Sequence, residues 1–196
     1  MNKTLIIVDP QYDFIEGGKL SVEGGTKALD NIVKYLKHGD ISTVIITQDW
    51  HQGKHESFKT EGGQWPEHCV KNTHGADIYK PILDAIEDQH LFCMYLKKGE
   101  HLEEYTAFKG MTSRFEKHWI EYLTSDDDIP YIMFHEDEII QICGLAGDVC
   151  VMNTAIALKN INPVIIDSLT ASIDENNFRY LADQNNITII DVDLYD

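Results

Sequence analysis

The sequence predicts an α/β fold in which a mainly parallel sheet of six strands carries helices on both faces. Short apolar runs rich in Ile, Val and Leu alternate along the chain with stretches whose apolar residues recur at helical spacing. This alternation is typical of right-handed strand–helix–strand units, which build parallel sheets. A length of 196 residues fits one domain, and we expect it to span residues 1–196.

Each predicted strand is a short, mostly apolar run bounded by polar or glycine residues. In chain order these runs are Thr4–Val8, Thr43–Thr47, Leu91–Leu96, Ile139–Cys143, Pro163–Ile166 and Ile187–Asp191. Each predicted helix is a stretch with apolar residues three and four positions apart. These stretches are Thr26–His38, Pro81–Asp88, Ser113–Thr124, Asp148–Lys159 and Glu175–Gln184. The segment from about 50 to 80 fits neither pattern, and an irregular segment of that length in a compact domain is usually functional.

Composition narrows the classes of partner. Sixteen basic against 33 acidic residues give a formal net charge of −17. Such a field repels nucleic-acid phosphates and anionic lipids, so we expect neither nucleic acid nor a membrane as partner. The first apolar run stops at Asp9, too early for a signal peptide or a membrane span. The four cysteines form no Cys-x-x-Cys pair, which predicts reduced thiols and a cytoplasmic protein.

Cys150 follows a predicted strand at a position that suits a nucleophile. The run Ile139–Cys143 leads through a Gly-rich turn into a predicted helix, so Cys150 falls in the first turn of that helix. There the helix dipole favours a thiolate, and free backbone N–H groups can bind an oxyanion. Two interpretations are open at this point: a buried structural cysteine or a nucleophile.

Two other strand ends supply groups that a cysteine hydrolase needs. Ligands of open α/β sheets bind beyond the carboxyl ends of the strands. Asp9 ends the first strand and can act as general base toward a thiol, or can be a simple turn residue. Lys97 and Lys98 end the third strand, and a lysine there can stabilise an Asp–Cys pair or remain solvated. Spacing does not separate the two lysines, but together these strand ends favour Cys150 as nucleophile.

The irregular segment carries residues that suit a metal ion. Asp49 and His51 are followed by His55 and, further along, by His68. Three or four N and O ligands, with positions left for water or substrate, describe a catalytic metal site. We expect one divalent ion, zinc first, with iron or manganese as alternatives because they accept the same ligands. His74 is a rival ligand, and surface histidines are the alternative interpretation.

Two aromatic residues lie close in sequence to these groups. Phe14 follows Asp9, and Trp65 precedes His68. They are either core residues or the two faces of a site for a planar substrate.

The combination of these blocks resembles the isochorismatase-like cysteine hydrolases, and within them the metal-dependent nicotinamidases. The blocks occur in the order of that family from residue 9 to residue 151, so the resemblance covers most of the chain. They are Asp9-x-Gln11-x-Asp13-Phe14, Thr47-Gln48-Asp49-Trp50-His51, Trp65-Pro66-x-His68-Cys69-Val70, Lys98-Gly99 with Tyr105-Thr106-Ala107-Phe108, and Gly144-Leu145-Ala146-Gly147-Asp148-Val149-Cys150-Val151. Gly147 and Val149 depart from the family, which often has threonine and tyrosine there.

The resemblance implies a three-layer α/β/α fold and a reaction. Nicotinamide, a small-molecule substrate, would be hydrolysed to nicotinate and ammonia through a thioester, in NAD salvage, and pyrazinamide would be a second substrate. The resemblance implies Asp9, Lys98 and Cys150 as catalytic residues. It also implies an oxyanion hole formed by the backbone N–H groups of Ala146 and Cys150, after a cis Leu145–Ala146 peptide bond.

The same resemblance implies the binding residues. Asp49, His51 and His68 match the metal ligands of the family, and His55 matches a ligand present in some members. The residues that would contact the substrate are Phe14, Trp65, Gln11 and Tyr105. A homo-oligomer is compatible with the resemblance. The alternatives are another amidase or isochorismatase-type hydrolase, which the metal ligands disfavour, and a non-catalytic metal-binding relative.

Overall fold

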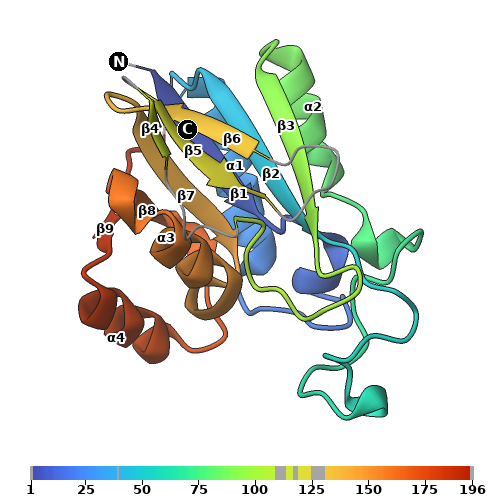
Figure 1. Ribbon diagram of the computed structural model, residues 1–196. Coiled ribbons are helices and arrows are strands. Elements are labelled where there is room, and N and C mark those ends of the chain that lie inside the picture. The colour runs from blue at the N-terminus through green and yellow to red at the C-terminus, as the bar shows by residue number, and fades with distance from the viewer. Residues whose placement is uncertain (1, 39, 109–113, 117–118, 125–130, 195–196) are drawn as a thin grey trace.

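The computed structural model describes residues 2–38, 40–108, 114–116, 119–124 and 131–194. The strands of the main sheet are β1 (Lys3–Val8), β2 (Thr43–Asp49), β3 (Phe92–Lys98), β7 (Ile139–Leu145), β8 (Val164–Ala171) and β9 (Thr188–Ile190). They lie in the order β3-β2-β1-β7-β8-β9, and every neighbouring pair is parallel (Figure 1). The predicted six-stranded parallel sheet is confirmed.

Helices cover both faces of this sheet, as predicted. α1 (Gly25–His38) and α2 (Lys80–Asp88) pack into one hydrophobic core. α3 (Met152–Ala157) and α4 (Glu175–Asn185) pack into the other. Figure 1 shows α3 and α4 together beside β7 and β8, and α2 beside β3.

A second, smaller sheet was not predicted. β4 (Arg114–Glu116), β5 (Trp119–Leu123) and β6 (Tyr131–His135) pair in antiparallel fashion, in the order β4-β5-β6. The helix predicted over Ser113–Thr124 is therefore wrong, although Ser113 and residues 117–118 lie outside the described part. Aromatic and β-branched residues such as Trp119, Ile120 and Tyr122 favour a strand. Apolar spacing in so short a stretch does not separate the two structures.

Alternate residues of β1 supply the two cores, as expected for a strand buried on both faces. Leu5 and Ile7 belong to the core that contains α1 and α2. Ile6 and Val8 belong to the core that contains α3 and α4. Phe134 of β6 is buried in that second core, so the small sheet adds to the covering of this face.

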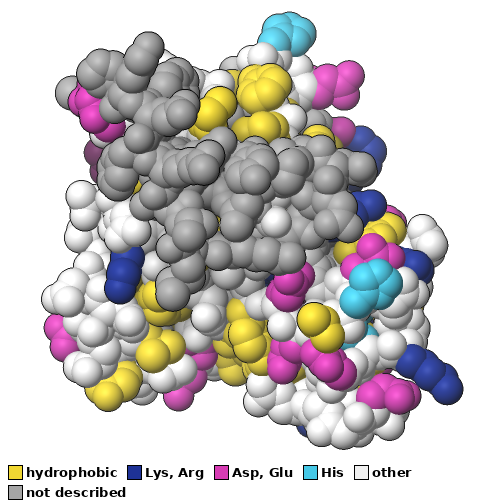
Figure 2. All heavy atoms as spheres, viewed as in Figure 1, with side chains coloured by type: hydrophobic (Ala, Val, Ile, Leu, Met, Phe, Trp, Pro, Cys, Tyr) yellow, Lys and Arg dark blue, Asp and Glu magenta, His cyan; other side chains and the backbone are white. Residues whose placement is uncertain are grey.

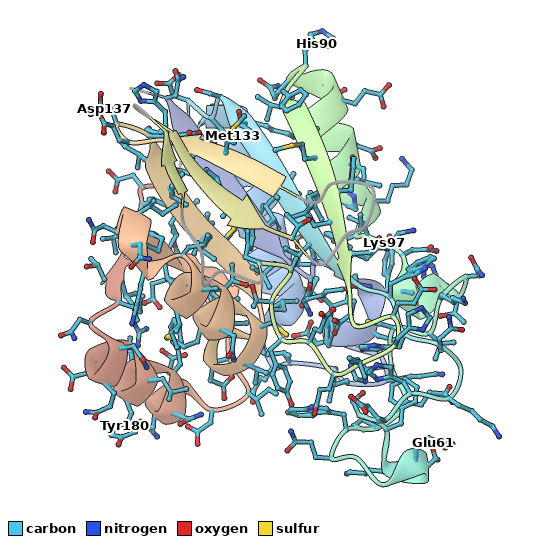
Figure 3. All side chains as sticks on the ribbon, in the orientation of Figure 1. Glu61, His90, Lys97, Met133, Asp137 and Tyr180 are labelled. Atoms are coloured by element: carbon cyan, nitrogen blue, oxygen red, sulfur yellow. The ribbon has the colours of Figure 1, made fainter. Side chains whose placement is uncertain are left out.

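The segment between β2 and α2 is irregular but ordered by its own contacts. Single bridges pair His51 with Val70 and Phe58 with Trp65. Phe58 is fully buried, while Glu61 lies at the tip of the segment, away from the sheet (Figure 3). The segment therefore folds back on itself and returns to the end of β2.

Acidic side chains are spread over the face shown in Figure 2, where the described Lys and Arg side chains stand apart from one another. This view fits the net charge of −17. Among the described residues, no helix is both long enough and apolar enough to cross a membrane.

Candidate active site

The carboxyl ends of the central strands bring the predicted catalytic side chains into one buried cluster. Lys98 Nζ lies 2.8 Å from Asp9 Oδ2 and 3.6 Å from Cys150 Sγ. The same ammonium group donates a hydrogen bond to Asp49 Oδ1. All four residues are buried. One lysine thus joins two carboxylates and a thiol.

Strand register explains why Lys98, and not Lys97, occupies this position. β2 and β3 pair Asp49 directly with Lys98. Side chains alternate along a strand, so the neighbouring Lys97 points to the opposite face. Its ammonium group lies 4.1 Å from the centre of the Trp50 ring. The register of β2 against β3 therefore decides between Lys97 and Lys98, which the sequence left open.

The two carboxylates that share Lys98 differ in their affinity for protons. Burial alone would raise the pKa of Asp49, but Lys98 and the neighbouring His51 and His68 hold it well below its usual range. For Asp9, burial outweighs the attraction of Lys98 and leaves the pKa raised. Burial also opposes the charge of Lys98, yet the two carboxylates hold its pKa well above its usual range. Asp9 is therefore the carboxylate that more readily takes up a proton.

Cys150 lies in a π-helical turn, Gly147–Val151, that leads into α3. We predicted a continuous helix over Asp148–Lys159 and a thiolate stabilised by its dipole. Instead, α3 ends at Ala157, and burial raises the pKa of Cys150 well above its usual range, although Lys98 acts in the opposite sense. Burial therefore favours the protonated thiol, and a nearby base is needed to make Cys150 a nucleophile.

Asp49, His51 and His68 form a second buried cluster beside the first. One ligand atom from each lies within 4.8 Å of the others. His51 Nε2 is 3.4 Å and His68 Nε2 is 3.7 Å from Asp49 Oδ2. Asp49 therefore presents one oxygen to the histidines and the other to Lys98.

The hydrogen bonds at Nδ1 of His51 and His68 orient both rings as metal ligands. His51 Nδ1 lies 2.6 Å from the carbonyl oxygen of Gly99, and His68 Nδ1 lies 2.7 Å from that of Pro66. A carbonyl oxygen only accepts, so each neutral ring carries its proton on Nδ1 and presents a lone pair at Nε2. Among the described residues, His51 Nε2 has no hydrogen-bond partner. Two imidazoles and a carboxylate held in this way form a candidate site for a divalent metal.

Two other histidines of the segment lie outside this cluster. His55 is buried, with Nδ1 2.7 Å from Ser57 Oγ and its ring centre 4.3 Å from that of His51. His74 is exposed, with Nδ1 3.3 Å from Asp77 Oδ2. The group of three ligand atoms includes neither His55 nor the rival His74. Among the described residues, however, His55 Nε2 is buried without a hydrogen-bond partner, as His51 Nε2 is, so His55 stays a predicted fourth ligand.

One pocket reaches both clusters. Its lining includes Cys150, Ala146, Asp49, His51, His68, Phe14, Trp65 and Tyr105. Phe14 is almost fully buried, and the Tyr105 hydroxyl accepts a hydrogen bond of 2.8 Å from Gln64. The Leu145–Ala146 peptide bond is cis, as the resemblance implied. The aromatic side chains and the few polar groups of this lining suit a small planar ligand.

Gln11 is not among the residues that line the pocket, although the resemblance implied that it contacts the substrate. Its amide group donates to the carbonyl oxygens of Asp49 and Ala76 at 2.8 and 2.9 Å, and accepts from the Asp49 N–H at 2.8 Å. Gln11 therefore fixes the backbone of Asp49 rather than a substrate.

Sequence reasoning missed two buried residues that organise the site. Thr47 Oγ1 donates a hydrogen bond of 2.6 Å to Asp9 Oδ1. The Asp13 carboxylate accepts from the N–H groups of Cys69 and Lys19 at 2.7 and 3.1 Å, and so joins two loops around the pocket. Both residues occur in the quoted blocks, but a bond between distant residues leaves no spacing pattern that could have revealed it.

Comparisons with known proteins place the chain in a family. The model of the isochorismatase domain matches residues 3–112. The nicotinamidase/pyrazinamidase of Mycobacterium tuberculosis is 33% identical, over 87% of this chain and 87% of that protein. The chain belongs to the isochorismatase family.

Solved structures agree with this fold. PnC1 from L. infantum, solved in complex with nicotinate, is 26% identical and has a TM-score of 0.73, over 97% of this chain and 92% of that chain. The pyrazinamidase of Pyrococcus horikoshii, solved in complex with zinc, is 23% identical and has a TM-score of 0.70, over 98% and 100% of the two chains. The Mycobacterium tuberculosis relative and the Pyrococcus horikoshii structure are thus named for nicotinamide or pyrazinamide hydrolysis.

Proposed function

We propose that this chain is a nicotinamidase, which hydrolyses nicotinamide to nicotinate and ammonia in NAD salvage. The observation that carries the proposal is a single pocket lined by the Cys150 thiol, the three candidate metal ligands and aromatic side chains. The name of the Mycobacterium tuberculosis relative supports it and extends it to pyrazinamide. Residues 1–196 would act as one hydrolase domain, with the segment at about 50–80 as its metal-binding insertion.

The first half of the reaction uses the buried cluster. The Cys150 thiol transfers its proton to Asp9 Oδ2 while Sγ attacks the amide carbon. The backbone N–H groups of Ala146 and Cys150 would hold the oxygen of the tetrahedral intermediate. Asp9 then returns the proton to the leaving nitrogen, and ammonia departs from a thioester. The Lys98 ammonium, 2.8 Å from Asp9 and 3.6 Å from Cys150, stabilises the negative charge that moves between them.

The second half restores the thiol. Asp9 takes a proton from a water molecule as its oxygen attacks the thioester carbon. The C–S bond breaks, nicotinate forms, and Asp9 returns the proton to Cys150 Sγ. The raised pKa of Asp9 suits a group that must hold a proton between the steps.

Asp49, His51 and His68 would hold one divalent metal ion. Zinc is the ion we propose first, because imidazole nitrogens and a carboxylate oxygen are ligands that zinc accepts in catalytic sites. When bound, the metal supplies a Lewis acid for the ring nitrogen of the substrate. Phe14 and Trp65 would flank the ring, and this orientation presents the carboxamide to Cys150.

Substrate hydrolysis tests the proposal directly. Purified, zinc-loaded protein should release ammonia from nicotinamide, with nicotinate as the second product. Benzamide is the matched control because it has the same shape without the ring nitrogen, and we expect it to be a much poorer substrate. Metal-loaded protein that releases no ammonia from nicotinamide would contradict the proposed activity.

Replacing His51 with alanine tests the metal site. The variant should lose most of its bound metal, because only two of the three ligands remain. It should also show a raised KM for nicotinamide, because the metal is needed to bind the ring nitrogen. Metal content by mass spectrometry and steady-state kinetics measure the two effects. His74→Ala is the control, since the exposed His74 lies outside the cluster. Equal metal content in the two variants would exclude His51 as a ligand.

A further inference from the structure

We infer that Thr47 is a positioning residue for Asp9, whose hydroxyl fixes which carboxylate oxygen receives the proton of the Cys150 thiol. The inference rests on the proposed function, in which Asp9 is the general base. It concerns a residue that is not among those lining the pocket.

The contacts between Thr47 and Asp9 form a closed ring. The Asp9 N–H donates to Thr47 Oγ1 at 3.2 Å, and Oγ1 donates to Asp9 Oδ1 at 2.6 Å. The Asp9 N–H also lies 3.2 Å from the carbonyl oxygen of Thr47. A hydroxyl group has one proton, and the carboxylate can only accept, so the O–H bond must point at Oδ1. Both residues are fully buried, and no solvent competes for these bonds.

This ring assigns different tasks to the two oxygens of Asp9. Oδ1 is occupied by Thr47, whereas Oδ2 lies 2.8 Å from Lys98 Nζ. Beyond that ion pair, Oδ2 has no hydrogen-bond partner among the described residues. A carboxylate oxygen of Asp9 lies within 4.8 Å of Cys150 Sγ. Thr47 therefore keeps Oδ2 available to the thiol.

The backbone of Asp9 shows that the position needs support. Its φ angle is +47°, in the left-handed region that residues other than glycine seldom adopt. A residue held in such a conformation depends on its surroundings, and strained residues of this kind cluster at functional sites. The Gln11 N–H donates to the Asp9 carbonyl oxygen at 2.8 Å, and Thr47 bonds to both the backbone N–H and the side chain of Asp9.

Substitutions at Thr47 separate the hydroxyl from the bulk of the side chain. Thr47→Val keeps the shape and removes the hydroxyl, whereas Thr47→Ser keeps the hydroxyl. For nicotinamide hydrolysis we expect Thr47→Val to lower kcat by about 10- to 100-fold with KM within about twofold, because misplacing a reacting group by about 1 Å has effects of this size. Thr47→Ser should stay within about threefold of wild type. If Thr47→Val does not fold, Thr47→Ala provides the same contrast.

A double-mutant cycle shows whether Thr47 acts through Asp9. The readout is the rate at which iodoacetamide alkylates Cys150, followed by mass spectrometry of that site, because it needs no turnover. Thr47→Val should slow alkylation in the wild-type background and have no further effect in Asp9→Asn. An equal effect in both backgrounds, or a Thr47→Ser variant as slow as Thr47→Val, would overturn the inference. Wild-type protein that does not hydrolyse nicotinamide would instead contradict the proposed function. The alkylation rates would then still show whether Thr47 positions Asp9 next to Cys150.

Discussion

Replacing Cys150 with alanine is expected to lower nicotinamide hydrolysis by at least about 10⁴-fold, because no other group can form the thioester. The cavity left by one sulfur atom is small, so the variant should fold and keep its metal. Release of ammonia and nicotinate, compared at equal metal content, measures the effect. The expected outcome is a folded, metal-bound protein without turnover.

Cys93→Ala is the matched control for the loss of a thiol. Cys93 lies on β3, half-buried and remote from the pocket lining, so its removal should leave kcat and KM unchanged. Substantial residual turnover in Cys150→Ala, or an equal loss in Cys93→Ala, would show that Cys150 is not the nucleophile.

Replacing Lys98 with methionine should impair both stability and activity. The side chain is fully buried and contacts Asp9 and Asp49, so its removal leaves two carboxylates without their cation. Breaking a buried ion pair by removing one partner typically costs about 3–5 kcal/mol of unfolding free energy. Denaturant unfolding measures this loss, and hydrolysis should fall by at least about 10²-fold because the charge on the Asp9–Cys150 pair is no longer stabilised.

The destabilisation should depend on pH with a definite sign. With Lys98 present, the pKa of Asp49 is depressed, so its contribution to stability is present above its unfolded pKa and is lost as pH falls. In Lys98→Met the buried carboxylates protonate more readily. The difference in unfolding free energy between wild type and variant should therefore shrink as the pH is lowered toward 4 and below.

Lys97→Met controls for the loss of a positive charge on the same strand. Lys97 points away from the cluster, at the outer side of β3 (Figure 3), and its ammonium group lies over the ring of Trp50. We expect a stability change below about 1 kcal/mol, the size of an exposed cation–π contact. Equal effects of the two lysine variants would contradict the assignment of Lys98 to the buried cluster.

The sequence was sufficient to predict the main sheet and most of the pocket. Buried parallel strands are continuous apolar runs whose carboxyl ends can be read directly from the sequence, and these ends predict that Asp9, the Lys97–Lys98 pair and Cys150 lie at one rim. The small β4-β5-β6 sheet was not foreseen, because its aromatic residues at helical spacing also fit a helix.

Other parts of the site depend on contacts between distant residues. The choice between Lys97 and Lys98 follows from the register of β2 against β3. The approach of the His55 ring to within 4.3 Å of the His51 ring follows from the path of the irregular segment. The pKa of Cys150 follows from burial, which no local pattern records. Register, loop path and desolvation all arise from the assembled fold, so sequence patterns alone do not specify them.

The end of β3 serves both clusters through two consecutive residues. The side chain of Lys98 binds the carboxylates, and the carbonyl group of Gly99 holds His51. A Cβ atom at Gly99, where φ is +68°, would lie 2.6 Å from His51 Cε1, so glycine is required there. An insertion or deletion that shifted β3 by one residue would turn Lys98 outward and move this carbonyl group at once. The cation beside Asp9 and Cys150 and the carbonyl group that orients His51 would then be lost together, so one dipeptide couples the catalytic cluster to the metal site.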